Sequence, residues 1–214
     1  MLNMINMEES KMHKAAFWNR IAEKYASSPI SDEAAYKRKL ELTQARMTPE
    51  TQALEFGCGT GSTALIHADH VKSYRATDFS DAMIEIARTK EPMPENLTFD
   101  VAAFDEMALD DESLDMVLGL SILHLVPDPR ATIAEAFRVL RLGGHFVTST
   151  ALLGRMWPLK LIAPLGQAIG RLPHLSFFGA EDLRAMMRDA GFEIEEDWQP
   201  DAGRTLFLIA QKPV

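Results

Sequence analysis

The residues best suited to chemistry lie in one short segment, Glu55-Phe56-Gly57-Cys58-Gly59-Thr60-Gly61. Its glycines let the chain turn tightly and let a ligand approach the backbone with no Cβ atom in the way. A helix is expected directly after this loop, and its first backbone N–H groups are free to bind a polar ligand. The segment is therefore predicted to bind a small molecule that contacts the main chain.

The spacing within this loop narrows the class of ligand. A dinucleotide-binding loop reads G-x-G-x-x-G and seats a pyrophosphate on the helix, whereas here the third glycine, Gly61, comes one residue early. Glu55 stands two residues before the first glycine, where its negative charge would repel a pyrophosphate and suit an ammonium group. The sequence also lacks a Tyr-x-x-x-Lys pair, so an NAD(P)-linked reductase is the weaker alternative.

Alternating strands and helices must position this loop. Short apolar runs predict strands, and amphipathic runs with a period near 3.6 predict helices. Strands are expected at 51–56, 71–77, 97–101, 114–120, 145–152, 192–197 and 205–211. Helices are expected at 10–26, 31–46, 62–69, 81–87, 131–141 and 180–190. Ser80 or Asp81 would cap the helix at 81–87, and Gly143 would end the helix at 131–141.

This order predicts an α/β fold, a Rossmann-like αβα sandwich around a mostly parallel seven-stranded sheet with an antiparallel last strand. A single domain is expected over residues 1–214. Residues 1–50 are expected to form a helical extension or lid, and residues 51–150 the ligand-binding core. Residues 151–178 are a substrate-side insertion, and residues 179–214 supply the closing helix and strands.

Four sequence blocks carry a family resemblance. They are LEFGCGTG (54–61), TDFSDAMIEIA (77–87), LDMVLGLSILHLVPDP (114–129) and FRVLRLGGHF (137–146). In order and spacing they resemble the motifs of class I S-adenosylmethionine (SAM)-dependent methyltransferases, in the small-molecule branch that includes enzymes of ubiquinone and menaquinone biosynthesis. The resemblance spans roughly residues 51–150 and implies SAM as the cofactor.

The resemblance also implies which residues hold SAM. The loop glycines would lie against its methionine part, Glu55 would face the amino group, Asp78 would accept hydrogen bonds from both ribose hydroxyls, and Phe79 and Met83 would flank the adenine. The full implied set is Glu55, Gly57, Cys58, Gly59, Gly61, Asp78, Phe79, Met83, Ala103, Phe104 and Leu120. Cys58 is expected to be a small filler between glycines rather than a nucleophile.

The chain departs from the family pattern at two positions. Ala103 stands where the family usually has an acid that binds the adenine amino group, so Asp105 or backbone groups of Ala103 and Phe104 are the alternatives. Leu142 replaces the usual proline before Gly143-Gly144, which affects turn rigidity more than chemistry.

Catalysis of methyl transfer depends mainly on positioning and desolvation, and a base is needed only for a protonated acceptor. His124 follows the fourth predicted strand and is the candidate base or acceptor contact; packing at the strand end is the alternative. Tyr25 and Tyr36 in the N-terminal extension are candidate lid residues that could touch a sulfonium, whereas Trp18 is expected to pack the extension onto the sheet.

The insertion at 151–178 is unusually apolar and contains Trp157, a further candidate substrate contact. It is expected to cover the core; lining a pocket for a lipophilic acceptor and forming a dimer contact are the alternatives. Arg155, Pro158, Lys160 and Pro164 interrupt the stretch, which argues against a membrane span.

Composition excludes several other functions. The net charge of −9 disfavours binding to nucleic acid or to an anionic membrane, and residues 81–115 hold eleven acidic and two basic residues. A single cysteine and no metal-ligand spacing argue against disulfides and a metal site and fit a cytoplasmic protein. The sequence thus predicts a cytoplasmic SAM-dependent methyltransferase for a small, possibly apolar acceptor, with a homodimer left open. A non-catalytic SAM-binding protein is the second alternative.

Overall fold

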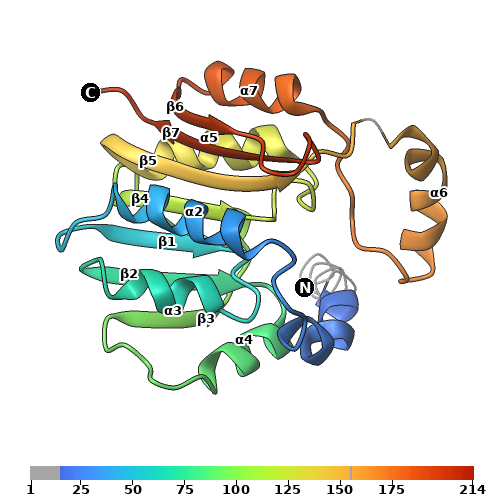
Figure 1. Ribbon diagram of the computed structural model, residues 1–214, viewed down its shortest axis with the longest axis horizontal. Coiled ribbons are helices and arrows are strands. Elements are labelled where there is room, and N and C mark those ends of the chain that lie inside the picture. The colour runs from blue at the N-terminus through green and yellow to red at the C-terminus, as the bar shows by residue number, and fades with distance from the viewer. Residues whose placement is uncertain (1–14, 155) are drawn as a thin grey trace, which may run out of the picture.

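A seven-stranded sheet forms the centre of the structure, a computed structural model that describes residues 15–154 and 156–214 apart from the side chains of Trp157 and Ala168 (Figure 1). The strand order is β3-β2-β1-β4-β5-β7-β6, and β7 runs antiparallel to both of its neighbours. The strands are β1 (Gln52–Phe56), β2 (Ser73–Asp78), β3 (Leu97–Val101), β4 (Leu114–Leu120), β5 (Leu140–Ala151), β6 (Glu193–Trp198) and β7 (Thr205–Gln211). The predicted Rossmann-like sandwich is confirmed.

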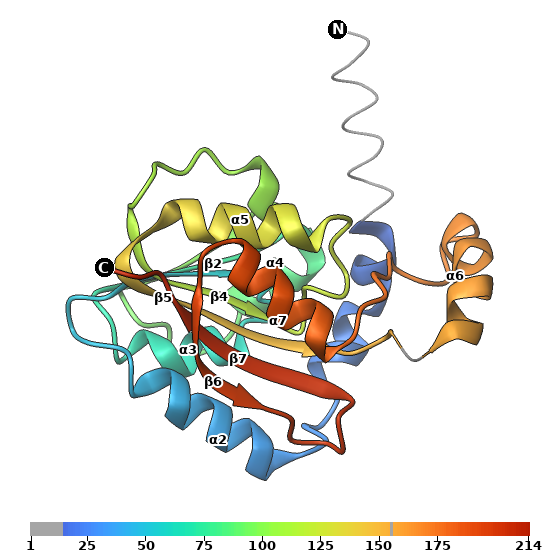
Figure 2. The same cartoon turned by 90° about the horizontal axis from the view of Figure 1, so that it is seen from above.

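Helices cover both faces of this sheet (Figure 2). One face packs against α5 (Pro129–Val139) and α7 (Ala180–Asp189), and the other against α2 (Glu33–Gln44), α3 (Ser62–Ala68) and α4 (Asp81–Arg88). Two hydrophobic clusters result, one on each face, and the central strands contribute alternate side chains to both. A short 3-10 turn, Phe104–Glu106, follows β3.

The ends of the strands explain where the ligand can bind. The order reverses between β1 and β4, because β2 and β3 extend the sheet on one side of β1 while β4 and β5 extend it on the other. Such a reversal leaves a crevice at the carboxyl ends of the two central strands. The glycine loop directly follows β1, so the topology places it at this crevice.

Helix α5 and strand β5 differ from the sequence expectation. The helix ends at Val139 rather than at 141, and β5 begins at Leu140, before the glycine pair. Gly143 has φ +78°, and the register between β4 and β5 shifts between Leu114 and Met116. The pair therefore forms an irregularity inside the strand instead of ending the helix, because glycine tolerates a conformation that lets the strand continue.

The insertion also differs from the expectation. It contains a helix, α6 (Trp157–Ala168), although two prolines lie within it. Pro158 occupies the first turn, where a proline suits a helix, and Pro164 removes one backbone hydrogen bond on an exposed stretch. In both views α6 stands apart from the sheet and its covering helices (Figures 1 and 2), so it does not cover the core.

Candidate functional site

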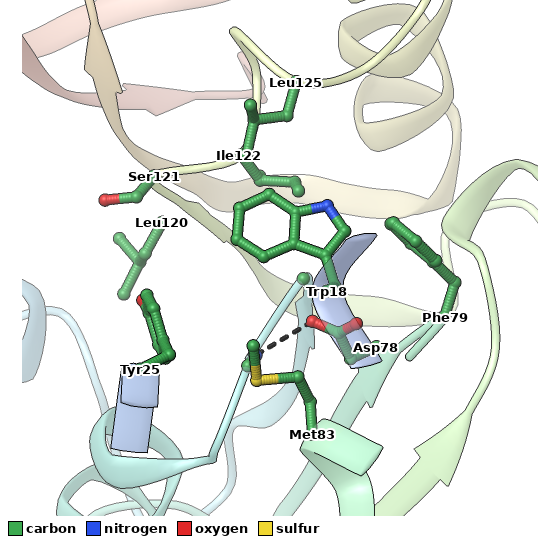
Figure 3. A pocket seen from close by; sticks show the side chains of 11 residues that line it. Trp18, Tyr25, Asp78, Phe79, Met83, Leu120, Ser121, Ile122 and Leu125 are labelled. Carbon is green, nitrogen blue, oxygen red and sulfur yellow. Dashed lines mark hydrogen bonds between the residues drawn. The ribbon is translucent and has the colours of Figure 1, made fainter. Parts of the chain in front are cut away.

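A cavity lies at the carboxyl ends of β1, β2 and β4 (Figure 3). Glycines of the loop after β1, the end of β2, the start of α4 and the loop after β4 form its walls, and the helical segment 15–26 closes it. Its lining residues are Trp18, Tyr25, Gly57, Gly59, Asp78, Phe79, Met83, Leu120, Ser121, Ile122 and Leu125. The structure thus brings together Tyr25 and six of the predicted cofactor residues.

The glycine loop needs its glycines for two physical reasons. Gly57, Gly59 and Gly61 have φ values of +65°, +54° and +73°, which L side chains rarely adopt. Space is also short, because a Cβ atom at Gly57 would lie 2.7 Å from Ile122 and one at Gly61 would lie 2.5 Å from the ring of Phe99. Gly57 and Gly59 therefore shape the cavity, whereas Gly61 serves the packing of the loop against the β3 side of the sheet.

Asp78 ties the end of β2 to the glycine loop. One carboxylate oxygen accepts from the backbone N–H of Gly59 at 3.0 Å, the dashed line in Figure 3, and the other accepts from that of Ser80 at 2.9 Å. Burial raises the pKa of Asp78, and these backbone hydrogen bonds oppose the shift. A backbone hydrogen bond from Phe79 also lowers the pKa. Because an ionised carboxylate has about four lone-pair directions, acceptor capacity remains for a ligand hydroxyl.

Glu55 lies beneath the loop rather than in the cavity wall. Its side chain is 2% exposed, and one carboxylate oxygen accepts from the Tyr74 hydroxyl at 2.7 Å. Burial raises the pKa of Glu55 to about 7, with a further contribution from the charge of Asp78, while the Tyr74 hydrogen bond lowers it. An acid in this position gains from a nearby cation, because a positive charge stabilises its ionised form.

The helical segment 15–26 forms a lid over the cavity. Trp18 and Tyr25 project into it from the same helix face, with their rings edge to face at 6.5 Å (Figure 3). The Asn19 side chain accepts from the Ser80 hydroxyl at 2.5 Å and holds the lid against the start of α4. Partial burial and the charges of Asp78 and Glu55 raise the pKa of Tyr25. Trp18 therefore faces the ligand site instead of packing on the sheet as expected.

The loop after β4 supplies an apolar wall that sequence reasoning missed. Ser121, Ile122 and Leu125 line the cavity beside Leu120. Ser121 has φ +58°, and its N–H donates to Ser149 at 2.6 Å, which holds this turn in a left-handed conformation uncommon for serine. The sequence offered no direct signal for these residues, whereas the seven-residue spacing of Trp18 and Tyr25 could have placed both on one helix face.

The other predicted residues lie around the cavity rather than in its lining. Cys58 lies between the two lining glycines, and burial raises the pKa of its thiol. Phe104 is buried and stacks on Phe56 at 4.5 Å, directly after Ala103. Tyr36 shares a hydrogen bond of 3.2 Å with Thr63 of α3. Trp157 begins α6, and its side chain lies outside the described part of the structure.

His124 belongs to the loop after β4 but is not among the lining residues. Its Nδ1 atom is buried without a hydrogen-bond partner within the described residues, and burial lowers the pKa of the imidazole to about 4. The ring is therefore neutral near pH 7. Its backbone oxygen accepts from the N–H of Ser176 at 2.8 Å, which links this loop to the insertion.

Fold and cavity together define a class of protein: an αβα domain with a cavity at the switch point of its sheet, a carboxylate at the end of β2 and a glycine loop after β1. Comparison with known proteins agrees. Residues 54–148 match the methyltransferase domain family. This match and the relatives described next confirm the resemblance to class I SAM-dependent methyltransferases.

Individual relatives point the same way. The chain is 28% identical over 171 residues to a Mycolicibacterium smegmatis protein named as an S-adenosylmethionine-dependent methyltransferase, covering 78% of this chain and 63% of that protein. It is 37% identical over 97 residues to the phthiotriol/phenolphthiotriol dimycocerosates methyltransferase of Mycobacterium tuberculosis, covering 44% and 36% of the two. The chain therefore spans less than two thirds of the length of these curated relatives.

A solved structure shares the fold. The S-adenosylmethionine-dependent methyltransferase from Mesorhizobium loti superposes with a TM-score of 0.69 at 21% identity, covering 83% of this chain and 98% of that one. Within the described ranges, no helix has both the length and the apolar character needed to cross a membrane. The same residues include no group of three or more His, Cys, Asp and Glu placed to hold a metal ion.

Proposed function

We propose that this chain is a SAM-dependent methyltransferase that acts on a small molecule with an apolar part. The observation that carries the proposal is Asp78, whose carboxylate lines the cavity at the end of β2 and is held there by backbone N–H groups of the glycine loop and of Ser80. Two neighbouring ribose hydroxyls suit this pair of acceptors. Gly57 and Gly59 leave the adjoining wall without side chains, and Glu55 beneath the loop favours a ligand with a positive charge.

The chain's own residues would contribute positioning and exclusion of water. When bound, SAM supplies a methyl group on a positively charged sulfur, ready for in-line displacement. Asp78 would orient the ribose, and Phe79 and Met83 would flank the adenine. Leu120, Ile122 and Leu125 form an apolar wall with Trp18, which supports an acceptor with an apolar part and a reaction in a water-poor site.

The remaining candidates take subsidiary roles in this proposal. Tyr25 covers the glycine loop, with its ring 3.3 Å from the position that a Cβ atom of Gly59 would take, and is placed to meet a cationic sulfur. His124 does not line the cavity and stays a predicted acceptor contact, while its pKa of about 4 suits it poorly for work as a base. Tyr36 and Trp157 stay predicted contacts, and a cytoplasmic location stays a prediction.

Calorimetric titration with S-adenosylhomocysteine tests the cofactor site. Removal of a charged acceptor costs about 1.5–3 kcal/mol, so Asp78→Asn should weaken binding roughly 10- to 100-fold. Asp81→Asn, an exposed acid in the first turn of α4, is the matched control and should bind like wild type. If Asp78→Asn disturbs the glycine loop, Phe79→Ala offers a second cavity variant, because the Phe79 side chain does not hold that loop.

Two further measurements separate the alternatives. A parallel titration with NADH should show no binding, and tight binding of NADH with none of S-adenosylhomocysteine would replace the proposal with a reductase. Incubation with methyl-labelled SAM and either the organic or the aqueous fraction of a metabolite extract should transfer label to the organic fraction. A chain that binds S-adenosylhomocysteine but labels neither fraction beyond the uncatalysed background is a non-catalytic binder.

A further inference from the structure

The outer face of α6 is an apolar stripe turned toward solvent. Leu161, Ile162, Leu165 and Ile169 are 72%, 62%, 70% and 58% exposed. Leu161, Leu165 and Ile169 follow one another at intervals of four residues, and Ile162 lies beside them, so all four occupy one side of the helix. Ala163, on the other side of the helix, is 1% exposed. An ordinary surface helix has the opposite arrangement, with its apolar stripe inward.

Charge around this stripe is positive. Residues 151–178 contain Arg155, Lys160 and Arg171 and no acidic residue, a segment of +3 in a chain of −9. Lys160 and Arg171 are exposed, one within α6 and the other just after it. An apolar helix face accompanied by basic residues is the pattern of helices that lie in the plane of a membrane surface. The acidic remainder of the molecule would turn this end toward an anionic surface.

We propose that α6 docks this protein onto the surface of an anionic phospholipid bilayer, without spanning it. The four apolar side chains would enter the headgroup region, and Lys160 and Arg171 would meet lipid phosphates. A second copy of this chain is the less favoured occupant, because a symmetric contact through the same stripe would gather two sets of basic residues at one interface. The net charge argued against anionic membranes only for the molecule as a whole.

The docking element is tied to the site through the segment that follows it, residues 170–176. The Arg20 guanidinium on the lid helix donates to the backbone oxygen of Gly170, just after α6, at 2.8 Å. Further along, the Ser176 N–H donates to His124 and its hydroxyl donates to Val126 at 2.7 Å, in the loop that lines the cavity. A bilayer that holds α6 would therefore lie beside the lid, the side from which an apolar acceptor could enter.

Vesicle co-sedimentation of the full chain tests this inference, with phosphatidylcholine vesicles compared with vesicles of equal parts phosphatidylcholine and phosphatidylglycerol. Wild type should bind the anionic vesicles and bind less as salt is added. Leu165→Glu should lower the partition coefficient by more than tenfold, since a charge cannot enter the apolar layer cheaply. Lys160→Gln should lower it about fivefold on anionic vesicles alone, because each basic residue contributes about 1 kcal/mol there.

Leu142→Glu is the matched control. Leu142 is 56% exposed and lies near the start of β5, at the opposite end of that strand from the insertion, so its exchange should leave vesicle binding unchanged. Equal unfolding midpoints of wild type and Leu165→Glu would show that the variant is folded. If Leu165→Glu does not fold, the binding of Lys160→Gln to the two vesicle types still tests the proposal.

Three outcomes would overturn the inference. They are equal binding of wild type and Leu165→Glu, an absence of binding to either vesicle, and a wild-type dimer that Leu165→Glu dissociates while neither protein binds vesicles. The last would assign the stripe to a second copy. The assay contains neither SAM nor acceptor, so its failure leaves the proposed methyl transfer untouched, and a failure of methyl transfer leaves vesicle binding untouched.

Discussion

Glu55 shows how a single residue can link cofactor binding to stability. Its carboxyl is buried beneath the glycine loop and has one hydrogen bond, from Tyr74. Burial disfavours the charged form, and no basic side chain contributes to its pKa. The fold thus carries an acid that is costly until a cation arrives, which suits a site for a positively charged ligand.

Glu55→Gln should therefore flatten the pH dependence of stability. The pKa of Glu55 is about 7 in the folded protein against an ordinary 4.5, so the folded state holds an extra proton between these values. Stability from this group is full below pH 4.5 and is lost as pH rises to about 7, by up to about 3 kcal/mol. Urea unfolding from pH 5 to about 8 should show wild type losing that much relative to the variant.

Glu95→Gln provides the control for that measurement, since Glu95 is exposed and its exchange should leave the wild-type pH dependence in place. Parallel curves for wild type and Glu55→Gln would mean that Glu55 does not hold its proton in the fold.

His124→Asn separates a neutral contact from a general base. A base typically contributes about 10²- to 10⁴-fold to the rate, whereas a neutral contact contributes much less. Because the pKa of His124 is about 4, we expect the variant to lose less than about tenfold in methyl transfer and to keep the wild-type pH profile above pH 6. A larger loss, together with the disappearance of an ionisation from the profile of kcat/KM, would make His124 the base.

Among the elements, the lid helix has the greatest influence on access to the site. With Trp18 and Tyr25 inside, the cavity has a volume of about 40 Å³, whereas pockets that enclose small ligands measure about 300–1,000 Å³. We therefore expect this helix to move when a nucleoside ligand enters. Its described attachments to the rest of the protein include Asn19 to Ser80 and Arg20 to Gly170, both at helix or loop ends.

Trp18→Ala should accelerate entry of the ligand. If the ligand binds only when the lid is open, its apparent association rate is lowered to the fraction of time that the lid is open. Removal of the indole of Trp18 enlarges the entrance, so that binding depends less on lid opening. We expect the stopped-flow association rate of S-adenosylhomocysteine to rise, roughly tenfold if opening costs about 1.4 kcal/mol. Phe17→Ala is the control, since Phe17 neighbours Trp18 but does not line the cavity. An unchanged rate in Trp18→Ala would show that the lid does not limit entry.

Sequence reasoning succeeded where one local pattern decides the structure. The strands near 51–56, 97–101 and 114–120 and the loop between β1 and α3 follow from apolar runs and glycines, and all lie where expected. Reasoning failed where distant contacts decide. The start of β5 depends on pairing with β4 and β7, and the direction of Trp18 depends on how the lid helix rests on α4.

The residues of the candidate site likewise fall into those that the sequence predicts and those that it does not. Asp78, Gly57 and Gly59 line the cavity, and they could be predicted because the family resemblance assigns these residue types to fixed positions after β1 and β2. Ile122 and Leu125 were not found, because an apolar wall requires only bulk and any apolar loop residue can supply it. The environment of His124 was equally hidden, since the burial that lowers its pKa comes from segments distant in sequence.

At the scale of the whole molecule, the acidic segment 81–115 forms ion pairs with other parts of the chain. Asp100 lies 2.7 Å from Arg75, Asp115 lies 2.6 Å from Arg141 and Glu112 lies 3.3 Å from Lys212; Asp111 pairs with Arg138. Exposed pairs of this kind contribute little each.

Hydrogen exchange should reveal how stability is distributed. β4 and β5 lie between two hydrophobic clusters and contain side chains that are fully buried, so their amides should exchange slowest, near the limit set by global unfolding. Amides of α6, which stands apart from the sheet, should exchange fastest among the helices. Mass spectrometry of peptic fragments gives this ranking, and protection of α6 equal to that of β4 would contradict it.

Cys58 is the single cysteine of the chain, so its thiol can serve as a built-in chemical probe. Cys58 lies between the two glycines of the cavity wall and packs against the hydrophobic cluster on the α3 and α4 face. Burial raises the pKa of its thiol, so alkylating reagents should react with it slowly while the glycine loop is closed. With a single cysteine in the chain, any label that does attach marks this position alone. The labelling rate should therefore report how often the glycine loop opens, and it can be measured without cofactor or acceptor and without a substitution.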